Sequence, residues 1–302
     1  MTIKSGRGED ETVLLVNTTK CKRCGQCTAV CKAGVLQRAH GAITISHGKS
    51  YGCIGCAHCA AVCPQGCIQL RGRTLGEDSL CPLPDAEKPS FDSLYALALT
   101  RRSVREYQEK EVPAELIEKI LTFTATAPVQ ITPSNVELLV LAGREKVQSF
   151  SFAVIDQMKK WRWLFSPLPR LILRPLLSRD EYAAITAFLL PLIATLEEKR
   201  AAGEDWLSGG APLAIYFYSA GFADPADCQV AATYAMLAGE TLGLSTCLLG
   251  SVAPFIRYSR SLRQQYGIPD NPVPGPLVLF GYPSVTYRRA IKRQPGRVHY
   301  SP

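Results

Sequence analysis

The sequence predicts an α+β protein in which a small cysteine-rich domain precedes a larger domain with a central mixed sheet packed by helices. Eight of the 12 cysteines fall between positions 21 and 63, in two runs with the same spacing. From Phe91 onward, helical apolar stripes alternate with short apolar runs that have the length of buried strands. A chain of 302 residues, 47% of them hydrophobic, is long enough for two domains, one with a sizeable core.

Both cysteine runs read C-x2-C-x2-C-x3-C, a spacing typical of bacterial proteins with two [4Fe–4S] clusters, in which the fourth cysteine ligates the other cluster. We therefore assign one cluster to Cys21, Cys24, Cys27 and Cys63, and the other to Cys53, Cys56, Cys59 and Cys31. A zinc site takes four ligands, usually as two CxxC pairs, and a disulfide framework suits small secreted domains, whereas no signal peptide precedes these residues. The runs resemble those of bacterial two-cluster ferredoxins, which implies a ferredoxin-like domain over residues 1–72.

Within this first domain, short strands are expected at residues 12–17, 42–45 and 67–70, so that a small apolar strand follows each cysteine run. Between residues 73 and 90 the composition shifts to Gly, Pro, Asp and Glu, which predicts a linker. The second domain is expected to occupy residues 91–302.

Helix start signals and apolar runs place the elements of the second domain. Ser90 or Asp92 can cap a helix, and Pro113 suits a first helical position. Residues 161–205 are expected to be mostly helical, with breaks at Pro167, Pro169, Pro175 and Pro191. We expect further helices at 144–160, 224–242 and 253–265, and strands at 136–142, 212–220, 244–249 and 277–281, before a basic C-terminal arm.

Three stretches of the second domain carry a family resemblance. They are Arg-Arg-Ser-Val-Arg at 101–105 after an apolar helix, the segment 238–250 with Gly-Leu-Ser-Thr-Cys at 243–247, and Gly-Tyr-Pro at 281–283 followed by a basic arm. Together with Gly-Ala-Pro at 210–212, they resemble the FMN-dependent nitroreductase family. The resemblance implies a nitroreductase-like domain over 91–302, a homodimer with FMN at the subunit interface and, with the first domain, a ferredoxin–nitroreductase fusion.

The same resemblance implies which residues contact FMN. It puts Arg101, Arg105 and Arg293 on the phosphate, with Arg102 and Ser103 on the flavin or its ribityl chain. Leu249 and Gly250 follow the isoalloxazine, and the segment with Pro128, Val129, Gln130 and Thr132 meets its pyrimidine end. In that segment the family's Asn-x-Gln-Pro is replaced, with Thr132 at the asparagine.

No protein side chain is assigned a catalytic role. The sequence has no G-x-G-x-x-G after a strand, no P-loop, no nucleophile elbow and no metal-type histidine pair. Bond making is therefore left to FMN, which delivers a hydride from N5, while the protein supplies position and electrostatics.

The predicted function is an iron–sulfur flavoprotein oxidoreductase of the cytoplasm. A reduced ferredoxin or similar one-electron donor would pass electrons through the two clusters to FMN. The acceptor would be a planar, electron-poor molecule such as a nitroarene, quinone, azo compound or activated alkene. Two alternatives stay open: reverse flow, with substrate oxidised at FMN and electrons exported through the clusters, and a non-catalytic carrier that docks to a larger redox complex.

The formal net charge of +8 does not indicate a nucleic-acid partner. Two oxidised clusters with their thiolates carry about −2 each, and a flavin phosphate about −2 more, so most of the excess base neutralises cofactors. The apolar run at 183–196 is interrupted by Pro191 and too short to span a bilayer. The aromatic, arginine-rich segment 161–177 is expected to pack in the core or a dimer interface, ahead of a wall over the flavin or membrane-surface attachment.

Overall fold

A computed structural model describes residues 2–4, 11–39, 42–46, 52–72, 76, 79–130, 135–166, 168–169, 174–219 and 223–301. It divides into two compact units: residues 1–88 with 129–135, and residues 89–128 with 136–302.

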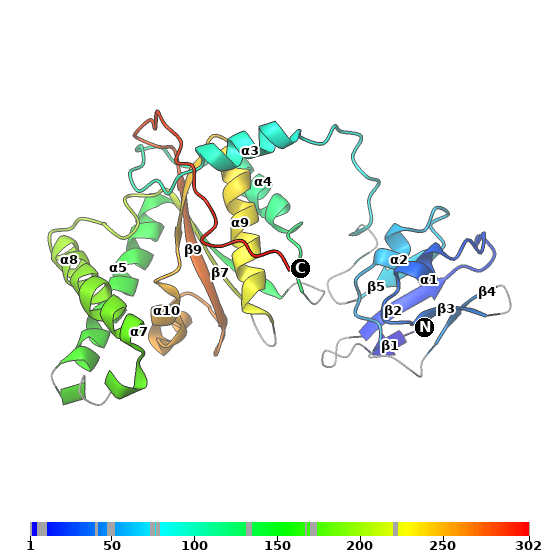
Figure 1. Ribbon diagram of the computed structural model, residues 1–302, viewed down its shortest axis with the longest axis horizontal. Coiled ribbons are helices and arrows are strands. Elements are labelled where there is room, and N and C mark those ends of the chain that lie inside the picture. The colour runs from blue at the N-terminus through cyan, green and yellow to red at the C-terminus, as the bar shows by residue number, and fades with distance from the viewer. Residues whose placement is uncertain are drawn as a thin grey trace. The chain divides into compact units, whose positions relative to one another are not determined.

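Among its described residues, the first unit has two small sheets and two short helices (Figure 1). β1 (Thr2–Lys4), β2 (Glu11–Val16) and β5 (Ile68–Arg71) form an antiparallel sheet, and β3 (Leu36–Ala39) pairs with β4 (Ala42–Ile45). Helices α1 (Gln26–Val30) and α2 (His58–Ala61) lie within the two cysteine runs. The sequence analysis did not predict β1 or β3, because each offers a single large apolar residue and so no alternation to detect.

The second unit has a four-stranded sheet in the order β6-β7-β9-β8. Its strands are β6 (Val136–Ala142), β7 (Leu213–Ser219), β8 (Ser245–Leu249) and β9 (Val273–Gly281), and all their pairs are antiparallel. A sheet with both parallel and antiparallel pairing was expected. Among the described residues, the parallel pairing in this sheet is one bridge between Ser103 and Thr246 at the edge strand β8.

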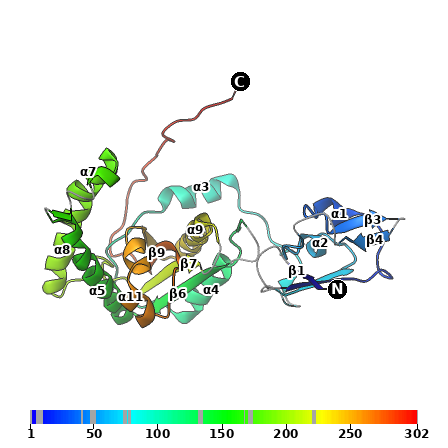
Figure 2. The same ribbon diagram turned by 90° about the horizontal axis from the view of Figure 1, so that it is seen from below.

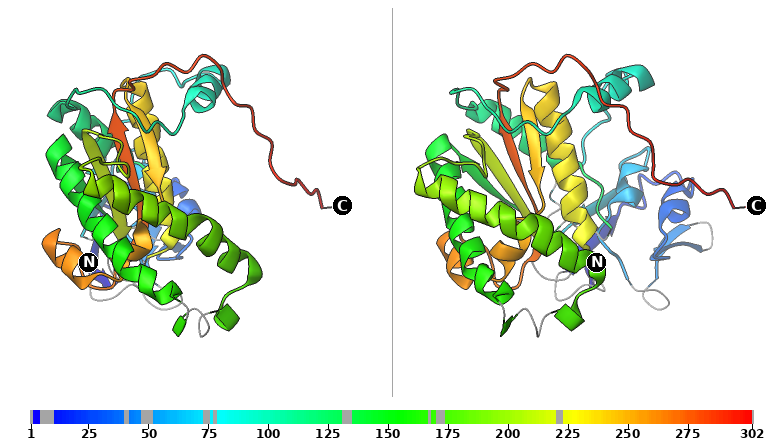
Figure 3. Two further views of the ribbon diagram at one scale, coloured as in Figure 1. Left: turned by 90° about the vertical axis from the view of Figure 1, so that its left-hand side faces the viewer. Right: turned by 60° about the vertical axis from the view of Figure 1, so that its left-hand side comes forward.

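Helices cover both faces of this sheet, and each interface is a hydrophobic core (Figure 3). α4 (Ala114–Thr124) and α9 (Pro225–Thr241) pack on one face, where Ile120 and Phe280 are fully buried. α5 (Arg144–Trp161) covers the other face, together with α10 (Ala253–Arg257) and α11 (Arg260–Gln265). The central strand β7 is buried along its whole length, as expected for a strand covered on both faces.

The segment between α5 and β7 is largely helical, as predicted for residues 161–205. Its described residues include the 3-10 turns η2 (Arg162–Phe165) and η3 (Arg174–Leu176), followed by α7 (Arg179–Ala184), η4 (Ile185–Leu189) and α8 (Leu190–Ala201). The predicted break at Pro191 is wrong, because η4 is a π-helical turn that joins α7 to α8. A proline ring clashes with the carbonyl four residues earlier in a regular helix, and the wider π turn at Ala187 removes that conflict. The predicted break at Pro167 lies outside the described residues.

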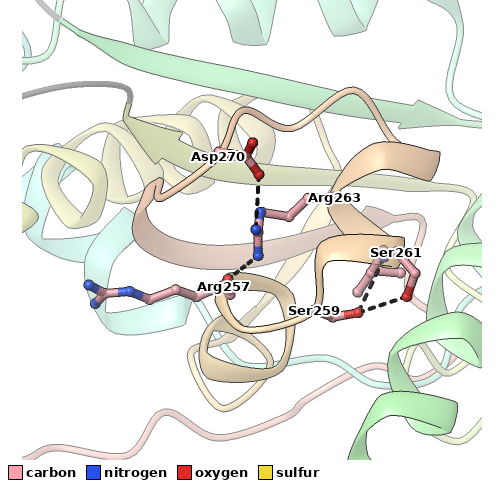
Figure 4. Close-up of polar contacts among 6 residues, drawn as sticks. Arg257, Ser259, Ser261, Arg263 and Asp270 are labelled. Atoms are coloured by element: carbon pink, nitrogen blue, oxygen red, sulfur yellow. Dashed lines mark hydrogen bonds and ion pairs between the residues drawn. The ribbon is translucent and has the colours of Figure 1, made fainter.

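The helix expected at 253–265 is two helices separated by a sharp corner (Figure 4). Ser259 caps α11 by accepting a hydrogen bond from the Leu262 amide at 3.2 Å. The buried Arg263 donates to the Arg257 carbonyl and to the Asp270 carboxylate, the latter at 3.1 Å. The arginine thus ties the corner to the loop that leads into β9.

Helix α3 (Phe91–Thr100) and the arm after β9 are exposed segments of the second unit. α3 is capped by Ser90, whose hydroxyl accepts from the Ser93 amide at 3.1 Å, and buries none of its residues. The basic arm after β9, residues 285–301, is exposed and forms no helix or strand (Figure 2). In the part of the chain that the structure describes, no helix is long and apolar enough to cross a membrane.

Candidate functional site

The structure gathers the eight predicted ligand cysteines into two groups. Burial raises the pKa of the Cys27 thiol, and the charges of Cys63, Cys21 and Cys24 raise it further. Burial likewise raises the pKa of Cys59 to about 12, with added repulsion from Cys53, Cys31 and Cys56. Each group therefore combines three cysteines of one run with the fourth of the other. Four thiolates held this close repel one another, so the donor set suits a cationic iron–sulfur core.

The backbone of the two cysteine loops explains how the sulfurs converge. α1 and α2 each begin after a residue in the left-handed region, Gly25 at φ 79° and Ala57 at φ 58°, which turns the chain sharply around the group. Backbone amides point at sulfur: Arg23 N–H donates to Cys21 Sγ at 3.3 Å and Gly55 N–H to Cys53 Sγ at 3.5 Å. Among the described residues, no three His, Cys, Asp or Glu side chains form a site for a single metal ion.

A second candidate site is an open cavity of about 530 Å³ in the larger unit. It lies between the end of α3, the following segment 101–105 and the arm at 287–293. Its lining includes five positively charged side chains and a serine: Arg101, Arg102, Arg105, Lys292, Arg293 and Ser103. Among the described residues no carboxylate lines it, so the cavity is suited to a multiply charged anion.

Segment 101–105 is held in place by the edge of the sheet. The Val104 amide donates to the Thr246 carbonyl of β8 at 3.1 Å, next to the Ser103–Thr246 bridge. The buried Tyr107 donates its hydroxyl to the Val104 carbonyl at 2.8 Å and bridges to Pro283 at the start of the arm. These contacts present the arginines on a fixed backbone and bring the arm beside them.

One of the positively charged side chains of this cavity has a buried nitrogen without a hydrogen-bond partner among the described residues. Arg102 donates Nη1 to the Arg101 carbonyl at 2.7 Å, whereas its buried Nη2 has no hydrogen-bond partner among the described residues. Behind the segment, burial raises the pKa of the Glu240 carboxyl, which accepts from the Thr246 hydroxyl at 3.2 Å. A buried guanidinium nitrogen without an acceptor fits an anionic group such as a phosphate, because that group would supply the missing acceptor.

The predicted flavin contacts fall into two sets. Arg101, Arg102, Ser103, Arg105 and Arg293 line the cavity together. Leu249 and Gly250 lie at the far end of β8 and do not line it. Pro128 is an exposed residue after α4, Val129 and Gln130 group with the first unit, and Thr132 lies outside the described residues.

Several residues near the cavity were missed in the sequence analysis, among them two tyrosines and a glutamate. Tyr95 and Tyr287 supply aromatic rings to the lining, and Glu240 lies behind it. Tyr95 could have been found from helical spacing. It lies one turn before Ala98 and Leu99, which also line the cavity, so all three share one face of the helix. Glu240 had no such signal, because only tertiary packing brings it near Arg101.

Known proteins match both parts of the chain. Residues 98–282 match the model of the nitroreductase family, and residues 20–68 match that of a 4Fe–4S dicluster domain. A relative from Methanothermobacter thermautotrophicus, whose name refers to an NADH dehydrogenase or NAD(P)H nitroreductase, is 24% identical over 215 residues, covering 71% of this chain and 90% of its own. A relative of the same name from Archaeoglobus fulgidus is 27% identical over 204 residues, covering 66% and 92%.

A solved structure agrees at the level of the fold. A nitroreductase with bound FMN from Bacteroides fragilis superposes with a TM-score of 0.52 at 18% identity, covering 69% of this chain and 98% of that one. Because the family model spans more than half of the 302 residues, the chain belongs to the nitroreductase family, and it carries a 4Fe–4S dicluster domain ahead of the family's own.

Proposed function

We propose that this oxidoreductase passes electrons from a reduced ferredoxin or similar one-electron carrier, through two [4Fe–4S] clusters, to FMN, and from there to an organic acceptor. The acceptor class is planar and electron-poor: a nitroarene, quinone, azo compound or activated alkene. The observation that carries the proposal is the cavity with five cations and the orphaned Arg102 nitrogen, in a chain that also gathers eight cysteines into two groups.

The cavity residues support FMN as its occupant. Arg101, Arg105 and Arg293 would hold the phosphate, and Arg102 with Ser103 would bind the adjoining ribityl oxygens. When bound, FMN accepts single electrons and donates two with a proton as a hydride, which links one-electron carriers to two-electron chemistry. The tyrosine hydroxyl of Tyr107 and the sheet edge would keep these side chains oriented.

The proposal includes a homodimer in the cytoplasm. Phe91, Leu94 and Tyr95 of α3 are at least 41% exposed, and the arm exposes Tyr287 and Ile291, an apolar surface that a second copy would cover. The cytoplasm is proposed because the two cysteine groups need reduced thiolates for their clusters.

Anaerobic purification tests the cofactors. The chain should hold about eight iron atoms and one non-covalent FMN. Iron near half that content would refute the two-cluster assignment, and FAD or no flavin would refute the flavin assignment.

An Arg101→Ala, Arg105→Ala variant tests the phosphate contacts. A charge-assisted hydrogen bond contributes about 1.5–3 kcal/mol, and the exposure of Arg105 favours the lower end. FMN binding should weaken at least tenfold, riboflavin binding should change little because riboflavin lacks the phosphate, and Arg289→Ala, an exposed arm residue outside the lining, should behave as wild type. Unchanged FMN affinity in the double variant rejects the assignment.

Stopped-flow reduction tests the donor. We expect a reduced ferredoxin or a viologen radical to reduce the protein much faster than NADH or NADPH does, although the names of the relatives refer to those nucleotides. Equal or faster reduction by a nicotinamide nucleotide would contradict the proposed donor.

A further inference from the structure

The two halves of the small domain repeat the same turn after the fourth cysteine of each run. Residues 31–37 read Cys-Lys-Ala-Gly-Val-Leu-Gln, and residues 63–69 read Cys-Pro-Gln-Gly-Cys-Ile-Gln. The Gly34 amide donates to the Cys31 carbonyl at 3.0 Å, and the Gly66 amide to the Cys63 carbonyl at 3.1 Å. Both glycines have positive φ, 65° and 57°. The backbone is thus repeated, but a valine follows one glycine and a cysteine the other.

Cys67 is the ninth cysteine of the domain and is not needed to complete either ligand set. It is 3% exposed, and its counterpart Val35 is 2% exposed, so both side chains are core residues. The position of Cys67 is fixed on both sides, because its carbonyl accepts from the Asn17 amide at 2.8 Å and its own amide donates to Cys63 Sγ at 3.3 Å.

The Cys67 side chain faces the sulfurs of only one cysteine group. The hydrogen bond from its own amide to Cys63 Sγ keeps this side chain beside that sulfur. The side chain also lines the same small cavity as Cys21, Cys24, Cys27 and Cys63. At the other group the equivalent side chain is Val35, which has no donor.

We propose that Cys67 is an S–H donor to the ligand sulfurs of the cluster held by Cys21, Cys24, Cys27 and Cys63, and that it makes this cluster the higher-potential one of the two. Reduction adds negative charge to a cluster, so a donor at its sulfurs stabilises the reduced form more than the oxidised form. The duplicated halves are thereby made unequal, and the shared electron resides preferentially on this cluster. The inference rests on the two-cluster assignment of the proposed function.

Anaerobic redox titration followed by EPR spectroscopy tests this on the purified full-length protein, without donor or substrate. Cys67→Val, which copies the other half, should lower the higher of the two midpoint potentials and bring the two closer together. The loss of one weak hydrogen bond should change the distribution of the electron between clusters by up to about tenfold, which is 59 mV for one electron. Cys67→Ser keeps a donor and should retain the wild-type separation, whereas Cys67→Ala should behave as Cys67→Val.

The reciprocal variant Val35→Cys should raise the lower potential. Potentials that do not change in either Cys67→Val or Cys67→Ala overturn the inference. Loss of iron from both Cys67→Ala and Cys67→Ser would make Cys67 a ligand and overturn it too. These failures differ from a failure of the proposed function, which would appear as a wild-type iron content near half of about eight atoms.

Discussion

Replacing Tyr107 by Phe should destabilise the larger unit and weaken FMN binding together. The Tyr107 hydroxyl is the donor to the Val104 carbonyl at 2.8 Å, and both residues are buried, at 7% and 2% exposure. Burial holds the tyrosine pKa well above its usual range, so the hydroxyl keeps its proton to donate. The variant loses the hydrogen bond and leaves a buried carbonyl without it, which costs about 1–3 kcal/mol of unfolding free energy.

The second effect follows from the position of this bond. Tyr107 joins Val104, within the segment that carries Arg101 and Arg105, to Pro283 just after β9, so the loosened segment must be ordered again when FMN binds. A cost of about 1 kcal/mol corresponds to about a fivefold rise in Kd. Tyr216→Phe is the matched control. The Tyr216 hydroxyl is fully buried without a hydrogen-bond partner among the described residues, so its removal should be neutral or stabilise by about 1 kcal/mol.

Tryptophan fluorescence during urea unfolding provides the measurement. All three tryptophans, Trp161, Trp163 and Trp206, lie in the second unit, so their signal reports on that unit without the cluster domain. Each kcal/mol should also shift the melting temperature by about 2–4 °C. If Tyr107→Phe proves as stable as wild type, or if Tyr216→Phe loses as much stability as Tyr107→Phe, the reasoning from hydrogen-bond partners is refuted.

Three further predictions concern single residues. Glu240→Gln should flatten the pH dependence of stability. Burial raises the pKa of this carboxyl in the folded state above its usual value, so wild type should lose stability as the pH rises from about 4.5 toward that raised pKa. Urea titrations across this pH range should show the loss in wild type but not in the variant. Gly209→Ala should lower the free energy of unfolding by more than about 2 kcal/mol and disturb FMN binding, because its Cβ would lie 2.0 Å from the Arg105 carbonyl oxygen. Gly203→Ala, also at positive φ but with free space around the Cβ, should lower it by about 1 kcal/mol and leave FMN binding unchanged in fluorescence titrations. Cys56→Ala should impair reduction of FMN by a ferredoxin-type donor but leave FMN bound and directly reducible by dithionite. Electron transfer from donor to flavin at the wild-type rate would show that the clusters are not the input path.

Local signals predicted the fold best where they were strong. β6 has the predicted bounds, and α9 begins where Asp224 and Pro225 indicated, with the Asp224 carboxylate accepting from the Ala226 amide at 2.7 Å. β9 begins at Val273, four residues before the predicted start, because Pro274 and its neighbours conceal a strand in sequence. A bulge opposite them, between Tyr216 and Tyr218, accommodates the irregular pairing.

The candidate sites also differ in how much of each could be predicted from local sequence signals. The cysteine runs could be read from spacing alone, because the four cysteines of each run are close in sequence. The arginines at 101–105 carried meaning only through a family resemblance, since an isolated basic segment is usually a solvated surface. The orphaned nitrogen of Arg102 and the buried Glu240 could not be predicted, because both depend on which segments the fold brings together.

The exchange of the fourth cysteine between the two runs has a consequence for biogenesis. Cys63 joins the group formed by Cys21, Cys24 and Cys27, while Cys31 joins Cys59 and its neighbours. During synthesis, the first group lacks a sulfur until Cys63 has left the ribosome, by which time the second group is complete as well. If the proposed ligand sets hold, the two cubes can be inserted only after the whole domain has emerged, and oxidative loss of one would release a residue from the half that holds the other. Assembly and damage are thus shared events for the pair.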